Sequence, residues 1–150
     1  MGYRLWDTDY RIPTIGVRPQ ESRPIVGVMV KARNPLARLR KLIAALPETS
    51  EKLSHGAPTF WGGKKTFASF HDNHHGDGVV ALWCKLPSGA AQALAQSDPE
   101  IYFVPPYVGP SGWVGVRLDR DIDWEVVAGL LEEGYRTVAP KRAIKLLDGG

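Results

Sequence analysis

The residues best placed to do chemistry in this 150-residue chain are two lysines that follow two glycines, Gly62-Gly63-Lys64-Lys65. Two glycines between short runs of β-forming residues are typical of a tight hairpin turn. Lysines at such a tip can reach phosphates, which gives affinity for nucleic acid without reading its bases. An ordinary solvated turn would have the same sequence. A P-loop is excluded, because Lys64 stands where that motif needs glycine and no strand-to-helix turn follows.

A second polar cluster runs from His71 to Asp77 and includes the adjacent pair His74 and His75. Histidine and aspartate suit zinc or nickel. However, no second group of ligands follows at a recognisable spacing, and the adjacent histidines would point in opposite directions in an extended chain. We therefore interpret the cluster as a polar hairpin loop and predict no metal site. The alternate aspartates at 119–123 lack the glycine and glutamate of a calcium loop, so they predict a turn and a helix cap.

Catalytic chemistry has little support in the sequence. Cys84 ends the apolar run 79–84, where a buried thiol that acts as a small hydrophobic side chain is expected. A dyad of Cys84 with His55 would require the two residues to be neighbours in space. No nucleophile, base and orienting group can be named together, and no Gly-x-Ser-x-Gly occurs. The sequence therefore predicts a protein that is not an enzyme and needs no cofactor.

The cysteine content and the apolar runs of the sequence indicate the cellular compartment. A single cysteine excludes an internal disulfide and favours a reducing compartment. The apolar run 24–30 is too short for a membrane helix and lacks the features of a signal peptide. We therefore expect a cytoplasmic protein with no membrane partner.

Apolar periodicity predicts the helices and strands that hold these residues. Asn34 and Asp123 are expected to cap the first and last helices, and Pro47 and Pro140 to end them. The region 48–54 reads as a short helix or an irregular turn. The remaining segments alternate or are short and apolar, as strands are, apart from one Ala-rich helix. In order, the sequence predicts a helix at 34–46, strands at 59–61, 64–71 and 79–84, a helix at 87–97, strands at 101–104 and 113–118, and a helix at 124–138.

This order predicts an α+β fold in one domain, with an antiparallel sheet of about five strands and helices packed on one face. Residues 1–28 show no pattern and are expected to be a poorly ordered N-terminal extension, which leaves 29–150 as the domain. A start at Met29 is the alternative.

Charge is unevenly distributed along the chain. The net charge of +3 is carried by residues 1–33, and residues 34–150 are neutral overall. Within that neutral part, residues 34–70 hold six basic and two acidic side chains. Residues 71–135 hold three basic and ten acidic side chains. Residues 136–150 hold four basic side chains and one acidic one. A basic face would form only if the two basic segments met in the folded chain.

Several spaced motifs resemble the MmcQ/YjbR family between about residues 34 and 142. They are Leu46-Pro-Glu-Thr49, His55-Gly-Ala-Pro-Thr-Phe60, Gly63-Lys64 with Phe67-Ala68, Trp113-Val114-x-Val116, and Tyr135 near Ala139-Pro-Lys-Arg142. The resemblance implies a frataxin-like (CyaY-like) α+β fold. It also implies the double-wing DNA-binding role that has been proposed for the family. The iron surface of frataxin does not transfer, because the first helix here is basic.

Two functional hypotheses follow. The first is a non-enzymatic DNA-binding protein whose phosphate contacts come from basic side chains. A strand face shared by Trp113 and Arg117 could also stack a base, although a buried strand tryptophan is the commoner arrangement. The alternative is a module for a small ligand or a protein partner, with no nucleic acid. The basic set is Lys64, Lys65, Arg38, Lys41, Arg117, Lys141 and Arg142, and the alternative aromatic cleft is His55, Trp61, Tyr107 and Trp113.

Overall fold

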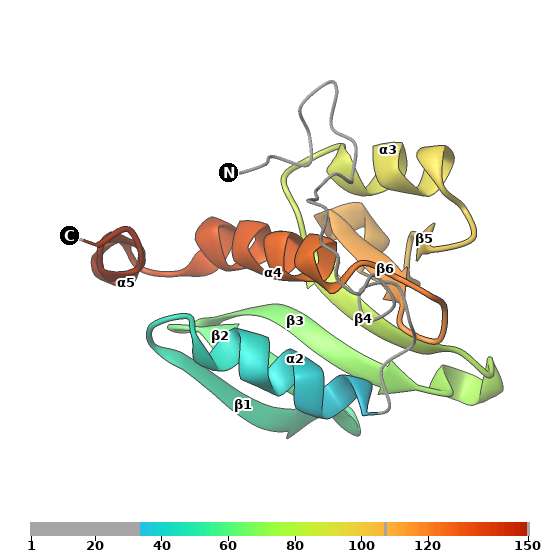
Figure 1. Cartoon of the computed structure of the whole chain (residues 1–150), viewed down its shortest axis with the longest axis horizontal. Helices are drawn as coiled ribbons and strands as arrows, with labels where there is room; N and C mark the ends of the chain where they lie inside the picture. Colours follow the sequence, from blue (N-terminus) through green and yellow to red (C-terminus); the bar gives the residue numbers. More distant parts are fainter. Residues whose placement is uncertain (1–33, 107, 150) are drawn as a thin grey trace, which may run out of the picture.

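The computed structural model describes residues 34–106 and 108–149 (Figure 1). Four α-helices, six strands and two short 3-10 turns follow one another in these residues. The expected extension at 1–28 and the start of the domain at 29 lie outside the described residues. The elements are α2 (Pro35–Ala44), β1 (Thr49–Ser54), β2 (Ala57–Gly62), β3 (Lys65–Asp72), η2 (His74–Gly76), β4 (Val80–Lys85), α3 (Ala90–Ser97), β5 (Tyr102–Phe103), η3 (Gly109–Ser111), β6 (Trp113–Arg117), α4 (Trp124–Val138) and α5 (Lys141–Leu147).

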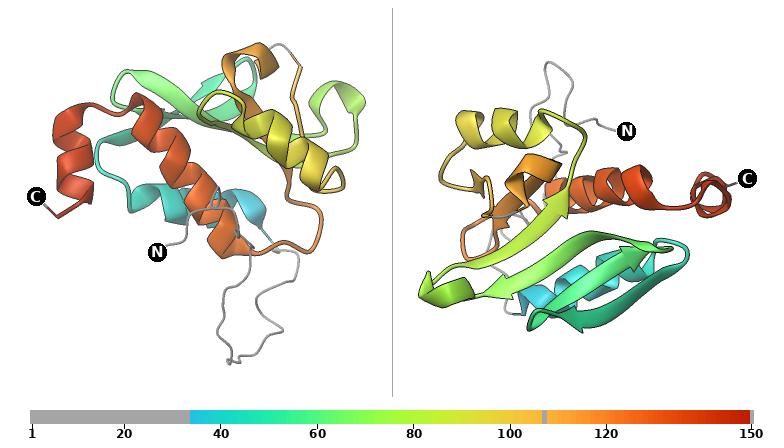
Figure 2. Two further views of the ribbon diagram at one scale, coloured as in Figure 1. Left: turned by 90° about the horizontal axis from the view of Figure 1, so that it is seen from above. Right: turned by 180° about the vertical axis from the view of Figure 1, so that it is seen from behind.

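The strands form one antiparallel sheet in the order β1-β2-β3-β4-β6-β5. Helices α2 and α4 cover one face, and η3 lies on the other (Figure 2). The α+β class, the antiparallel sheet and the helices on one face are therefore confirmed, with six strands where about five were expected. We refer below to the face opposite α2 and α4 as the helix-free face. None of the described helices is long and apolar enough to cross a membrane.

The additional strand is β1, and the interpretation of region 48–54 as a helix or irregular turn was wrong. After α2 the backbone of Glu48 adopts a positive φ of 58°, which reverses the chain into β1. The Thr49 hydroxyl donates to the carbonyl oxygens of Ile43 and Leu46, so the strand starts against the end of the helix. β1 lies at the sheet edge and is exposed on both faces, so no apolar alternation reveals it in the sequence.

The predicted hairpin is present, with its turn one residue later than expected. Gly62 ends β2 and pairs with Lys65, so Gly63 and Lys64 form the turn. Gly63 has a φ of +72°, a conformation that costs other residues about 1–2 kcal/mol. The register shifts beyond Phe60, where a bulge in β3 leaves Phe67 buried among the helices.

Both predicted helix caps are confirmed. The Asn34 side chain accepts from the Ala37 N–H at 3.1 Å, and Asp123 accepts from the Glu125 N–H at 2.9 Å. Pro140 ends α4 as expected, but the chain then forms α5, which the sequence did not predict. Gly134 lets α4 approach the sheet closely, since a Cβ there would lie 2.6 Å from the Lys85 carbonyl oxygen.

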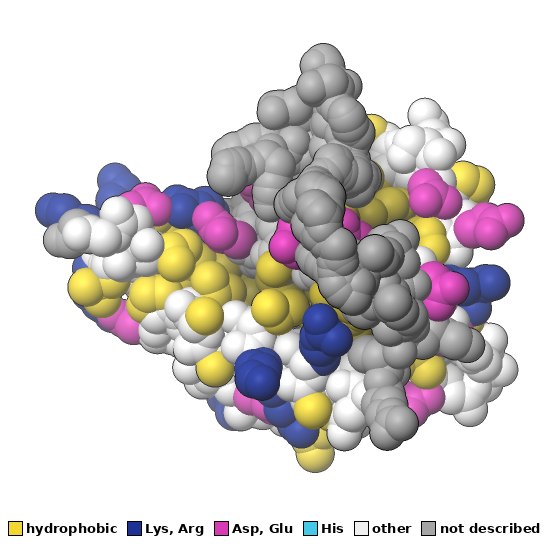
Figure 3. Space-filling view, in the orientation of Figure 1, with side chains coloured by type: hydrophobic (Ala, Val, Ile, Leu, Met, Phe, Trp, Pro, Cys, Tyr) yellow, Lys and Arg dark blue, Asp and Glu magenta, His cyan; other side chains and the backbone are white. Residues whose placement is uncertain are grey.

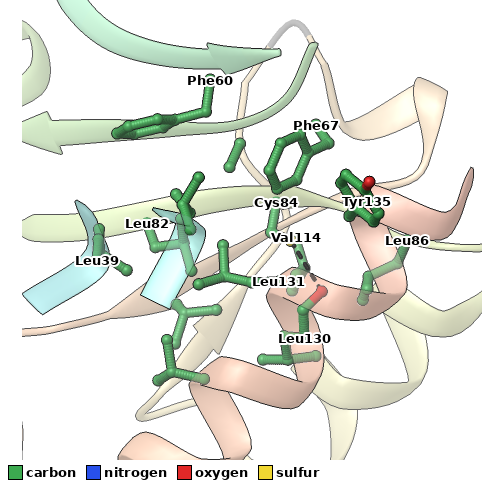
Figure 4. Close-up of a cluster of buried hydrophobic side chains, with 14 of the residues drawn as sticks. Leu39, Phe60, Phe67, Leu82, Cys84, Leu86, Val114, Leu130, Leu131 and Tyr135 are labelled. Carbon is green, nitrogen blue, oxygen red and sulfur yellow. Dashed lines mark hydrogen bonds between the residues drawn. The ribbon is translucent and has the colours of Figure 1, made fainter. Parts of the chain in front are cut away.

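The main core lies between the sheet and the helices. Figure 4 shows Phe60, Phe67, Leu82 and Val114 from the strands meeting side chains of α2 and α4. The sulphur of Cys84, 0% exposed, donates to the Leu130 carbonyl oxygen at 3.2 Å (Figure 4). The expectation of a buried cysteine that packs as a small hydrophobic side chain is confirmed, and burial raises the pKa of its thiol.

A second, smaller apolar cluster lies on the helix-free face. It is formed by Ala81, Trp83 and Trp113, with Val79, Phe103 and Val108 packed against them. Trp113 is only 9% exposed, which confirms that it is a packing residue. The sheet is therefore buried on both faces over β4 and β6, whereas β1 is not.

Candidate nucleic-acid interface

Two basic segments that lie far apart in the sequence meet at one end of the molecule. The β2–β3 turn packs against the α4–α5 junction, where a Cβ on Gly63 would lie 2.7 Å from Cδ of Pro140. A Cβ on Gly62 would similarly lie 3.2 Å from the Tyr135 ring. The absence of side chains at both glycines therefore allows this contact, which places Lys64 beside the start of α5.

The α2–β1 loop also contacts this end of the molecule, through hydrogen bonds to the β2–β3 turn, α4 and α5. The N–H of Gly63 donates to the Glu48 carbonyl oxygen at 3.0 Å, and the Tyr135 hydroxyl donates to that of Pro47 at 2.6 Å. The Arg142 guanidinium donates to both Glu48 carboxylate oxygens, at 2.9 and 2.7 Å. This carboxylate raises the pKa of Arg142 and fixes the direction of its side chain.

We call Lys64, Lys65, Lys141 and Arg142 the basic end. All four are exposed, and no described residue forms an ion pair with any of the three lysines. Figure 3 shows lysine and arginine side chains around α5, with a few acidic ones among them, and further acidic side chains on the opposite side, near α3 and β5. The neutral domain is therefore electrically polarised, and its basic end would attract an anion.

The other two basic candidates in the helix layer lie on α2. Arg38 is in its first turn, with its guanidinium carbon 5.0 Å from the centre of the Trp124 ring at the start of α4. Lys41 is exposed in the last turn of α2. Arg38 therefore faces the end of α4 that is farthest from α5, apart from the basic end.

Arg117 lies on the helix-free face and is paired. Its Nε and Nη2 atoms donate to the two carboxylate oxygens of Asp119 at 3.0 Å each. Arg117 shares this face with Trp113 as the alternation predicts, but Gly115 lies between them. The Phe103 ring covers Gly115, at 2.2 Å from where a Cβ would be. Trp113 and Arg117 therefore do not form a joint stacking surface.

The His71–Asp77 cluster is a packed loop. Within residues 34–106 and 108–149 no group of three or more histidine, cysteine or acidic side chains could hold a metal ion. The His71 ring stacks on Trp83 with centroids 3.7 Å apart, and its Nε2 lies 2.8 Å from the Ser69 hydroxyl. Burial, helped by the neighbouring His74 and opposed by Asp77, lowers the pKa of His71 to about 4.

The described members of the alternative aromatic cleft do not meet. His55 lies in the β1–β2 turn, at the opposite end of β2 from Trp61. Trp113 is on β6, three strand positions from β2, which is roughly 14 Å. Tyr107 lies outside the described residues. The exposed His55 is also far from the buried Cys84, so the two form no dyad.

The sequence reasoning missed two residues at this end of the sheet. Glu48 anchors the basic end, and Lys52 places its Nζ atom 4.8 Å from the centre of the Trp61 ring. The position of Lys52 could have been predicted from strand alternation, but only if β1 had been recognised as a strand.

Known proteins share the fold and the family of this chain. The model of the YjbR family matches residues 44–137. A crystal structure of Deinococcus radiodurans protein DR2400, with domain DUF419, superposes with a TM-score of 0.60 at 22% identity. That match covers 75% of this chain and 87% of the Deinococcus chain. No curated protein matches this sequence. Because the family model spans more than half of the sequence, the chain is a member of the YjbR family.

Proposed function

We propose that this protein is a non-enzymatic DNA-binding protein that holds phosphates at its basic end. The observation that carries the proposal is the contact between the β2–β3 turn and the α4–α5 junction at Gly63 and Pro140. This contact brings Lys64 and Lys65 together with Lys141 and Arg142, although the domain as a whole is neutral.

The chemistry of these side chains suits phosphate contacts. The three lysines have no ion pair to break among the described residues, so binding a phosphate costs them no protein contact. Arg142 is already directed by Glu48 and presents a fixed guanidinium. Contacts of this kind give affinity that tolerates any sequence and falls steeply with salt.

The surroundings of Cys84 and His71, in the part of the chain that the structure describes, support the non-enzymatic part of the proposal. Cys84 is buried and bonded to Leu130, and His71 is engaged by Ser69 and stacked on Trp83. The same buried, reduced cysteine supports a cytoplasmic location. The alternative of a small-ligand or protein-binding module is less favoured, because the described residues of its aromatic cleft do not converge.

The test is a salt titration of duplex binding by the full chain. Four phosphate contacts would give a slope of about −3.6 for log affinity against log salt. Lys64→Glu/Lys65→Glu should make the slope shallower, at about −1.8 or closer to zero, because two phosphate contacts are lost. The proposal fails if the wild type does not bind at low salt, an outcome that would favour the ligand or protein module.

A matched control separates a local interface from net charge. Arg120→Glu changes the charge as Lys64→Glu does, but beyond the other end of α4, a helix of 15 residues and about 22 Å. Lys64→Glu should weaken binding clearly more than Arg120→Glu. Equal weakening by the two variants would mean that the protein binds DNA through its overall charge alone.

A further inference from the structure

Trp61 differs from the other tryptophans that the structure describes. Trp124 belongs to the main core, and Trp83 and Trp113 form the smaller cluster on the helix-free face. Trp61 belongs to neither cluster and is half-buried on the helix-free face. A large, partly exposed aromatic side chain that belongs to neither apolar cluster is a candidate for binding.

The surroundings of Trp61 are polar and basic. Ser50 and Thr66 pair with Trp61 from the neighbouring strands and therefore flank it on the same face. The Nζ atom of Lys52 lies over the ring, 4.8 Å from its centre. No described residue forms an ion pair with Lys52. The result is an aromatic ring beneath a cation that has no ion pair, outside both apolar clusters that the described residues form.

This ring is next to the basic end. Trp61 lies two residues before Gly63, about 7 Å along the strand, and Lys65 pairs with the intervening Gly62. Gly62 and Lys65 face the helices, on the side away from Trp61. The phosphate contact that could place the adjoining base over Trp61 is therefore at Lys64 in the turn. Lys52 would then contact that base or its phosphate.

We infer that the Trp61–Lys52 pair is a stacking site for an unpaired base, so that the protein prefers single-stranded over duplex nucleic acid. This inference rests on the proposed function, since the lysines of the turn supply the phosphate contacts. Base pairs in a duplex are stacked on one another and cannot offer a free face to a side chain. A single strand can do so, and an aromatic side chain accepts any base.

The experiment compares two single strands that differ only in their bases. The full chain is titrated with an oligothymidine of about 15 nucleotides and with an abasic strand of equal length. We expect the thymidine strand to bind roughly five- to a hundredfold more tightly. Trp61→Ala should remove this difference and leave abasic binding unchanged. Trp61→Phe, which keeps an aromatic face, should retain part of it.

Leu53→Ala is the matched control, because Leu53 is 74% exposed on the neighbouring strand and belongs to neither apolar cluster. It should leave both affinities unchanged. Equal binding of the two strands by the wild type would overturn the inference and leave phosphate binding intact. Equal loss of both affinities in Trp61→Ala would also overturn it. The proposed function fails as well if Lys64→Glu/Lys65→Glu weakens binding neither to the single strands nor to the duplex.

Discussion

Acidification should destabilise this protein through His71. The ring stacks on Trp83, lies 2.8 Å from the Ser69 hydroxyl and packs edge-on against His74. A proton on His71 would put charge into this partly desolvated cluster, next to a second histidine. The neighbouring Asp77 offsets the effect only in part, so the pKa of His71 falls from 6.5 to about 4.

The sign and size of the effect follow from linkage. Because the pKa of His71 is lower in the folded state, the unfolded chain takes up the proton first as the pH falls. His71 therefore stabilises the fold fully above pH 6.5, and this contribution is lost progressively down to about pH 4. A fully buried group with this difference in pKa would contribute about 3 kcal/mol. The ring is partly exposed and screened, so we expect about 1–2 kcal/mol.

The assay measures the free energy of unfolding by urea at about pH 7.5 and about pH 5. Wild type and His71→Asn are compared, so that other groups titrating in both proteins cancel. The stability gap between them should narrow at the lower pH by about 0.5–1 kcal/mol, because about pH 5 is still above the folded-state pKa and only part of the contribution is lost there. The imidazole C–H resonance that is missing from the NMR spectrum of the variant should titrate well below 6.5 in the wild type. A gap that does not change with pH, or a resonance that titrates near 6.5, would show that His71 is not desolvated in the folded protein.

Two further predictions concern a glycine and the thiol. Gly63→Ala should destabilise by about 2–4 kcal/mol, because a positive φ is combined with a clash at Pro140, whereas Gly56→Ala, which has a φ of +81° and open space, should cost about 1–2 kcal/mol in the same urea assay. Equal costs would show that the Pro140 contact is not tight. Cys84 should resist a thiol reagent such as Ellman's reagent in the native protein and react only after denaturation, because it is buried and bonded to Leu130. Rapid native labelling would contradict this.

The sequence was sufficient where local rules and burial agree. The caps at Asn34 and Asp123 and the burial of Cys84 all follow from residue type and periodicity. So do the alternation in β6 and the β2–β3 hairpin, although the turn of this hairpin lies one residue later than predicted. The family was also recognisable from spaced motifs. These features depend on neighbouring residues or on one apolar face, so a linear pattern contains enough information to find them.

The sequence failed where an element has no apolar pattern of its own. β1 is an exposed edge strand, so its side chains do not alternate between apolar and polar. α5 has seven residues and follows Pro140 directly. Because Pro140 was predicted to end the last helix, no further helix was expected after it. Because β1 was missed, so was Lys52 over Trp61.

Residue types and their order were enough to predict an α+β fold whose residues 34–150 are neutral overall, with basic segments at 34–70 and 136–150. The folded chain shows that parts of these segments meet, while Arg38 and Arg117 lie elsewhere. The physical reason is that charge can be counted along a chain, but proximity depends on packing. Here it depends on two glycines without side chains, against which Tyr135 and Pro140 can pack.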